Sequence, residues 1–261
     1  MPARTLSGGE PITVDFTEKR GGPRWTRAFR QMIASSGVVD MTVVVFDPDS
    51  VPRRPLRSRR WWEDDRYRVS RAAAMAAMDI FGQRHDERLR RKHPDVGAAQ
   101  WARLFHIHVA NEPVGKPISL DTFFGPWFDM RRRQLIIDGG FANDPPTARA
   151  RDEATAHVQY WLRARGLEAT EEHNPGLTGA LLYQPSGPCF GALPAQVFNR
   201  IFCEFVEQIL YDAQRPLTIF EWSDDWSNYF DAGKEWWGTY FWTVLIEDLS
   251  EVVAIGASAS E

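Results

Sequence analysis

Tryptophan and acidic side chains alternate in one stretch near the end of this chain, from Phe220 to Trp242. Five of the eleven tryptophans lie in it: Trp222, Trp226, Trp236, Trp237 and Trp242. Four carboxylates lie between the rings: Asp224, Asp225, Asp231 and Glu235. An aromatic ring of this size buries on the order of 150–250 Å², so the rings either form a core or anchor a binding surface.

Three interpretations of this block stay open. The rings could pack a sheet while the Asp224–Asp225 and Asp231–Gly233 segments form turns, for which Asp and Gly are suited. Paired carboxylates beside Trp platforms could instead cleave glycosidic bonds. In the third interpretation the block is a recognition surface for a basic protein, with exposed rings as anchors and carboxylates as partners of cations. Its binding residues would be Trp222, Asp224, Asp225, Trp226, Tyr229, Asp231, Glu235 and Trp237.

His106 and His108 have the spacing of a possible metal site. Residues two apart in a strand share a face, so both imidazoles could reach one transition-metal ion. A further ligand would have to come from elsewhere, and Asp138, His157 and His173 are the candidates. The alternative is an exposed strand face with Phe105, Ile107 and Val109 directed inward.

Two other segments could carry chemistry. Cys189 precedes a helix that Pro194 is expected to begin, and a thiolate is favoured near a helix N-terminus, although a small buried cysteine is the simpler interpretation. The arginine-rich run from Arg53 to Arg60 could contact nucleic acid. The acidic residues that follow it, and the pI of 5.9, favour a loop that pairs with the acidic end of the chain.

The pattern Trp-Ser-x-x-Trp-Ser-Asn-Tyr-Phe-Asp-x-Gly-x-Glu-Trp-Trp-Gly, held by Trp222 to Gly238, resembles the C-terminal region of a group of small bacterial proteins. Some of those proteins look like the immunity proteins of toxin systems. The resemblance extends over Phe220–Ser258 and carries no catalytic residue. It implies a bacterial protein that binds another protein, without a required cofactor.

Composition narrows the class of protein. With 43% hydrophobic and 25% charged residues, the chain is expected to be a soluble globular protein. It has no apolar run long enough to span a membrane and no secretory signal, so a cytoplasmic location is expected. The two cysteines predict no disulfide framework. Charge is uneven: residues 51–100 carry 13 Lys/Arg and 7 Asp/Glu, whereas residues 201–261 carry 2 and 12.

Hydrophobic periodicity predicts the elements that would hold these residues. Helices are expected to begin near Trp25, Ser70, Asp144 and Pro194; in the last of them, Asn199 and Glu204 would face water. Strands are expected at 12–16, 38–46, 103–110, 135–138 and 217–222. A hairpin of 236–246 with 251–257 should end the chain, with its first strand central because both of its faces are apolar. Residues 111–126 are expected to form a loop, since they contain three prolines.

These elements predict an α+β fold with a mixed or antiparallel sheet and several amphipathic helices. Residues 1–145, with a basic linker at 47–68, and residues 146–261 would be two regions, or the whole chain a single domain. The leading functional hypothesis is an immunity- or adaptor-like protein that binds a basic partner through the acidic aromatic surface and is not an enzyme. A hydrolase that depends on a metal or on carboxylates is the alternative, and a nucleic-acid-binding protein using Arg53–Arg60 is the second.

Overall fold

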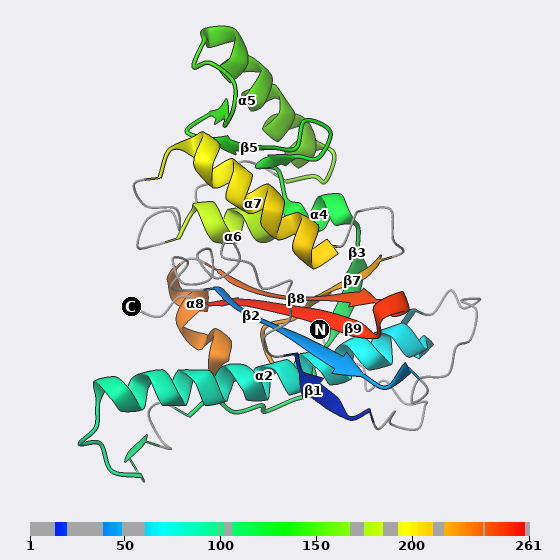
Figure 1. Ribbon diagram of the computed structural model, residues 1–261, viewed down its shortest axis with the longest axis vertical. Coiled ribbons are helices and arrows are strands. Elements are labelled where there is room, and N and C mark those ends of the chain that lie inside the picture. The colour runs from blue at the N-terminus through cyan, green and yellow to red at the C-terminus, as the bar shows by residue number, and fades with distance from the viewer. Residues whose placement is uncertain are drawn as a thin grey trace.

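The computed structural model describes most of the chain. The described residues are 14–19, 39–48, 61–98, 100–101, 106–167, 175–184, 193–210, 217–236 and 238–258, without the side chains of 16, 208–210 and 235–236. Two layers of helices enclose a six-stranded sheet, and a smaller sheet with one helix lies at the far end (Figure 1). The fold is α+β, as predicted.

Every pair of neighbouring strands in the large sheet is antiparallel, in the order β1-β2-β9-β8-β7-β3. The strands are β1 (Phe16–Glu18), β2 (Val39–Phe46), β3 (Gly115–Ile118), β7 (Leu217–Trp222), β8 (Thr239–Ile246) and β9 (Glu251–Ser258). Strands from both sides of residue 145 therefore share one sheet, and a boundary near that residue does not divide it.

The predicted C-terminal hairpin is confirmed. β8 pairs with β9 from Thr239↔Ser258 to Ile246↔Glu251, and Ser250 closes the connection in the left-handed conformation (φ 52°). Side chains alternate along β8: Phe241 joins the core beneath one face and Trp242 the core beneath the other. The strand is central and apolar on both sides because helices cover both faces.

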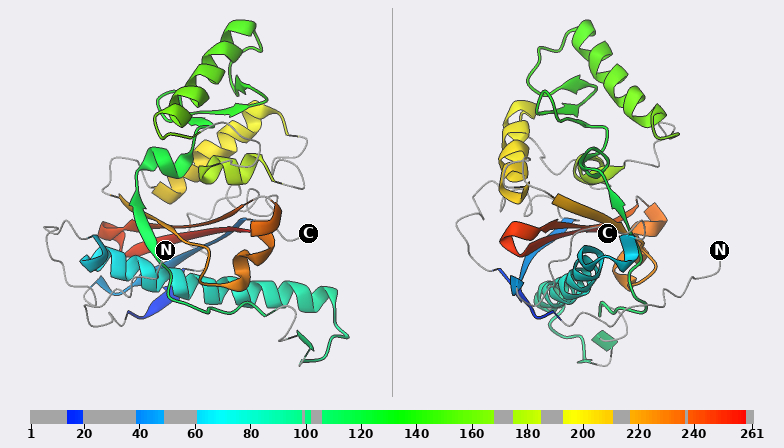
Figure 2. Two further views of the ribbon diagram at one scale, coloured as in Figure 1. Left: turned by 180° about the vertical axis from the view of Figure 1, so that it is seen from behind. Right: turned by 90° about the vertical axis from the view of Figure 1, so that its right-hand side faces the viewer.

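A long helix, α2 (Asp65–Lys92), covers one face (Figures 1 and 2). It begins five residues before the predicted start, because the Asp64 carboxylate caps it by accepting the Arg66 N–H (2.8 Å). Ser70, the predicted cap, is instead buried inside the helix. Small side chains such as Ala74 and Ala77 allow the helix to pack closely on the aromatic face of the sheet.

Three helices cover the opposite face: α4 (Leu120–Phe124), α6 (Gly176–Leu182) and α7 (Ala195–Leu210). The α7 helix matches its predicted apolar stripe, but Asn199 does not face water. Its side-chain amide accepts the Leu135 N–H (2.7 Å) and donates to the Arg133 carbonyl (3.3 Å). The Asn199 side chain thus joins α7 to the smaller sheet by bonding to backbone groups of Leu135 and Arg133.

Part of the predicted loop at 111–126 is the edge strand β3, followed by α4. The Ser223 N–H donates to the Val114 carbonyl (2.7 Å), so this pair of residues is a hydrogen-bonded one. Because bonded and non-bonded pairs alternate along antiparallel strands, the backbone N–H positions of residues 115 and 117 in β3 point away from β7. Pro117 has no N–H, so it fits such a position without losing a ladder hydrogen bond. Proline here also limits pairing with another strand.

The smaller unit contains β4 (Phe128–Asp129), β5 (Gln134–Ile137), β6 (Gly140–Phe141) and α5 (Ala148–Arg163). It has its own small core of Ile136, Phe141 and Ala154. Thr147 caps α5 by accepting the Ala150 N–H (3.2 Å), close to the predicted start. In Figure 1 this helix lies at the end of the molecule opposite to α2.

Candidate functional site

Three of the five C-terminal tryptophans belong to the core. Trp222, Trp226 and Trp242 are 5%, 0% and 0% exposed. The Trp222 indole N–H donates to the Thr243 hydroxyl (2.9 Å), and its ring stacks on Tyr67 of α2. The expectation that Trp222 and Trp226 are exposed anchors is therefore wrong, because the two rings complete the core between the sheet and α2. The Glu235 and Trp236 side chains and Trp237 lie outside the described residues.

Tyr229 is partly buried against the same core, and its hydroxyl is bonded within the protein. It lies in the short helix η3 (Asn228–Phe230), and its hydroxyl donates to the Asp40 carboxylate of β2 (3.0 Å). Burial raises the pKa of the Asp40 carboxyl, and burial together with the Asp40 charge raises the pKa of the Tyr229 hydroxyl well above its ordinary value. The hydrogen bond from Tyr229 and the charges of Arg88 and Arg84 of α2 partly offset the effect of burial on the pKa of Asp40.

Two carboxylates of the block, Asp224 and Asp225, lie on a hydrogen-bonded turn, where Asp224 is half-buried and Asp225 is exposed. We call residues Ser223–Asp225 the acidic turn. The Asp224 carboxylate accepts the Thr239 hydroxyl, and the Asp225 carboxylate accepts the Ser223 hydroxyl (2.6 Å). The buried Trp226 indole closes the turn by donating to the Ser223 carbonyl (2.7 Å). Asp224 and Asp225 thus form a turn, and this turn still leaves Asp225 exposed.

Cations are sparse around this turn. Within the described residues, no Lys, Arg or His nitrogen forms an ion pair with Asp224 or Asp225. Asp231, the first residue of α8 (Asp231–Trp236), has a 70% exposed side chain and lies 3.7 Å from Lys234. Other acids of the C-terminal region do have partners, such as Glu247 with Arg66 and Glu251 with Lys19.

The structure brings the histidine pair to the aromatic block. The Asn228 amide accepts the His108 N–H (2.7 Å) and donates to the His106 carbonyl (3.0 Å). The Ser227 hydroxyl donates to the His108 carbonyl (3.0 Å), and Val109 forms a bridge with Ser227. The predicted strand at 103–110 is wrong for its described part, 106–110, which has only an isolated bridge and is held by these side chains and by the Ala110 N–H, which donates to the Trp226 carbonyl (2.8 Å).

Among the described residues, the two imidazoles do not come together with Asp138 or His157. The His106 ring is 56% exposed and its Nδ1 lies 3.4 Å from the Asp86 carboxylate of α2. His157 belongs to the smaller unit, where its Nδ1 lies 3.7 Å from Asp129, and Asp138 lies in the β5–β6 turn. In the part of the chain that the structure describes, no three His, Cys, Asp or Glu residues are placed to hold an ion. His173, Cys189 and Arg53–Arg60 lie outside the described residues.

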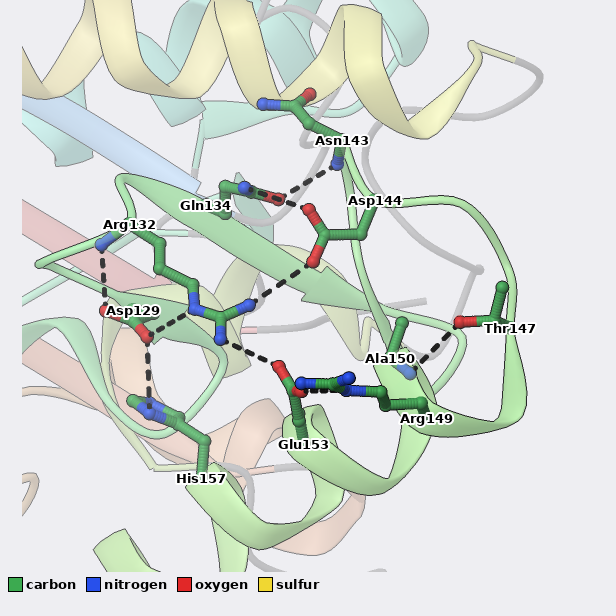
Figure 3. Close-up of polar contacts among 10 residues, drawn as sticks. All are labelled: Asp129, Arg132, Gln134, Asn143, Asp144, Thr147, Arg149, Ala150, Glu153 and His157. Carbon is green, nitrogen blue, oxygen red and sulfur yellow. Dashed lines mark hydrogen bonds and ion pairs between the residues drawn. The ribbon is translucent and has the colours of Figure 1, made fainter.

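A second polar cluster lies in the smaller unit, around Arg132 (Figure 3). Its guanidinium donates to Asp144 (3.2 Å) and Glu153 (2.9 Å) and lies over the Phe141 ring (4.2 Å). Hydrogen bonds from Arg132 and Arg149 lower the pKa of the Glu153 carboxyl. This cluster joins β4, the 142–147 loop and α5, which is a structural role. The sequence signal was weak, since it consists only of an arginine run and acids at scattered positions.

Comparison with protein-family models, with curated proteins and with solved structures found no match. Among the described residues, no helix has both the length and the apolar character required to cross a bilayer.

Proposed function

We propose that the protein binds a protein partner through the acidic turn, together with the exposed Asp231 of α8, and that the partner supplies Lys or Arg side chains. The observation that carries the proposal is the pair of adjacent carboxylates, Asp224 and Asp225, which have hydroxyl donors but no cation partner among the described residues. A carboxylate that already has a fixed position loses little side-chain entropy when a cation pairs with it.

The tryptophans take a different part in this proposal from the one that the sequence suggests. Trp222 and Trp226 support the turn from beneath, since both rings are buried and Trp226 is hydrogen-bonded to it. Recognition therefore depends on charge, and it gives a fast, salt-sensitive association. The resemblance of Trp222–Gly238 to bacterial immunity-type proteins favours a cytoplasmic bacterial protein of the immunity or adaptor kind, whose partner would be a basic toxin in the first case.

The experiment compares capture of partners from a cell extract by three immobilised proteins: the natural chain, the Asp224→Asn/Asp225→Asn variant, and a control with the same charge change, Glu87→Gln/Asp95→Asn. Glu87 and Asp95 are exposed and lie on and just beyond α2. A partner of the acidic turn should be retained by the natural chain and the control, lost by the first variant, and released by salt. Equal retention by all three proteins would contradict the proposal.

A further inference from the structure

The α5 helix contacts the rest of the protein through one face only. Its buried residues are Ala150, Ala154, Trp161 and Leu162. The opposite face is exposed along its whole length, and it includes Tyr160, whose 76% exposure is the largest among the exposed large hydrophobic residues of the described chain. An exposed Tyr beside Arg is typical of the anchors of protein interfaces.

Four exposed residues of this face form a single stripe: Asp152, Ala156, Gln159 and Arg163. They follow one another at steps of four, three and four residues, which is the spacing of the seam through which two helices pack side by side. Thr155 and Tyr160 lie on either side of the stripe. Ala156, near its middle, is small enough to allow close approach of a second helix.

The stripe is complementary to itself when it is reversed. If a second copy of α5 lies antiparallel across a two-fold axis between residues 157 and 158, Asp152 of each copy faces Arg163 of the other. Ala156 likewise faces Gln159 of the other copy. A two-fold interface requires this reciprocity, in which the same surface serves both subunits. Asp152 has no ion pair among the described residues, and Arg163 contacts only the amide of Gln159 (3.5 Å).

We propose that two copies of the chain pair through the exposed faces of α5, antiparallel, with two Asp152–Arg163 ion pairs. The two Tyr160 rings lie on the same face of the helix pair, one on each side of the axis. The α5 helix lies at the end of the molecule, away from the large sheet (Figure 1). One helix pair buries less area than a standard interface, so the dimer dissociates readily on dilution.

Charge reversal tests this pairing by sedimentation equilibrium of the full chain. The natural protein should dimerise with increasing concentration. Arg163→Glu alone and Asp152→Arg alone should each weaken dimerisation by about tenfold or more, because like charges then face each other twice. An equimolar mixture of these two variants should dimerise again, since each chain then supplies the charge that the other requires. Arg151→Glu, which reverses an exposed charge away from the stripe, is the matched control and should dimerise like the natural protein.

The mixture separates this proposal from the alternatives. A natural chain that stays monomeric at every concentration would overturn the proposal, as would single variants that dimerise like the natural chain. Failure of the mixture to recover, with both variants folded by circular dichroism, would mean that the stripe contacts something other than its own copy. Asp224→Asn/Asp225→Asn should leave dimerisation unchanged, so the two proposals fail independently.

Discussion

Asp40 shows how single side chains couple the aromatic block to the rest of the protein. Its carboxylate accepts the Tyr229 hydroxyl (3.0 Å), which joins η3 to β2. The groups that act on it are Arg84, His85 and Arg88, all from α2. Burial outweighs their attraction and raises the pKa of the Asp40 carboxyl above 3.8, its ordinary value.

This pKa shift predicts a pH-dependent effect of Asp40→Asn. A carboxyl with a raised pKa binds its proton more tightly in the folded protein, so stability falls as pH rises from 3.8 through the folded pKa and stays lower above it. Asn cannot ionise and still accepts the Tyr229 hydroxyl. The unfolding free energy of the variant minus that of the natural protein should therefore be larger at about pH 8 than at about pH 4, as measured by urea denaturation. An equal difference at both pH values, or a larger gain at the lower one, would contradict this.

Residue types alone did not reveal which rings are buried. Trp222 and Trp226 lie in the sequence among acidic residues, a type that is usually exposed. Both rings are nevertheless buried and complete the core beneath the acidic turn. Their environment is set by α2, which is more than 120 residues earlier in the chain. The choice between core and surface anchors therefore depends on long-range packing that periodicity within the block does not contain.

The α5 helix is attached by its buried residues and, on the side of the smaller sheet, by the Arg132 guanidinium, which donates to Glu153. Replacing Arg132 by Met removes the cation from between Asp144 and Glu153 and leaves the two acids facing each other. Amide hydrogen exchange in α5 should then become several-fold faster, while β8 and β9 keep their protection. Arg149→Met is the control, since Arg149 is 90% exposed and, within the part of the chain that the structure describes, pairs only with Glu153. Equal exchange in both variants would show that Arg132 does not hold α5.

Local signals predicted the regular elements well. The apolar stripe of α7, the start of α5 and the pairing of the C-terminal hairpin each depend on signals within one segment. The 106–110 segment and β3 were not predicted, because their hydrogen-bond partners are distant in sequence: the Asn228 side chain in the first case and β7 in the second. Asn199 was assigned to solvent for the same reason.

Strands from both halves of the chain form one sheet, and ion pairs among the described residues join its basic and acidic regions. Arg66 and Glu247 form an ion pair between the basic region at 51–100 and the acidic region at 201–261. Internal pairing thus accounts for some C-terminal acids, while Asp224 and Asp225 keep only hydroxyl donors among the described residues. Net charge does not predict which carboxylates lack a cation partner, because that depends on which strands become neighbours.

The dissociation constant of the captured partner measures the role of the acidic turn most directly. Calorimetric titration would compare Asp225→Asn with Asp95→Asn, which removes the same charge from a distant exposed site. We expect Asp225→Asn to raise the dissociation constant by about tenfold at low salt and to weaken its salt dependence, because a charged hydrogen bond to the partner is lost. Asp95→Asn should change neither quantity. Identical dissociation constants and salt dependence for the two variants would contradict the account.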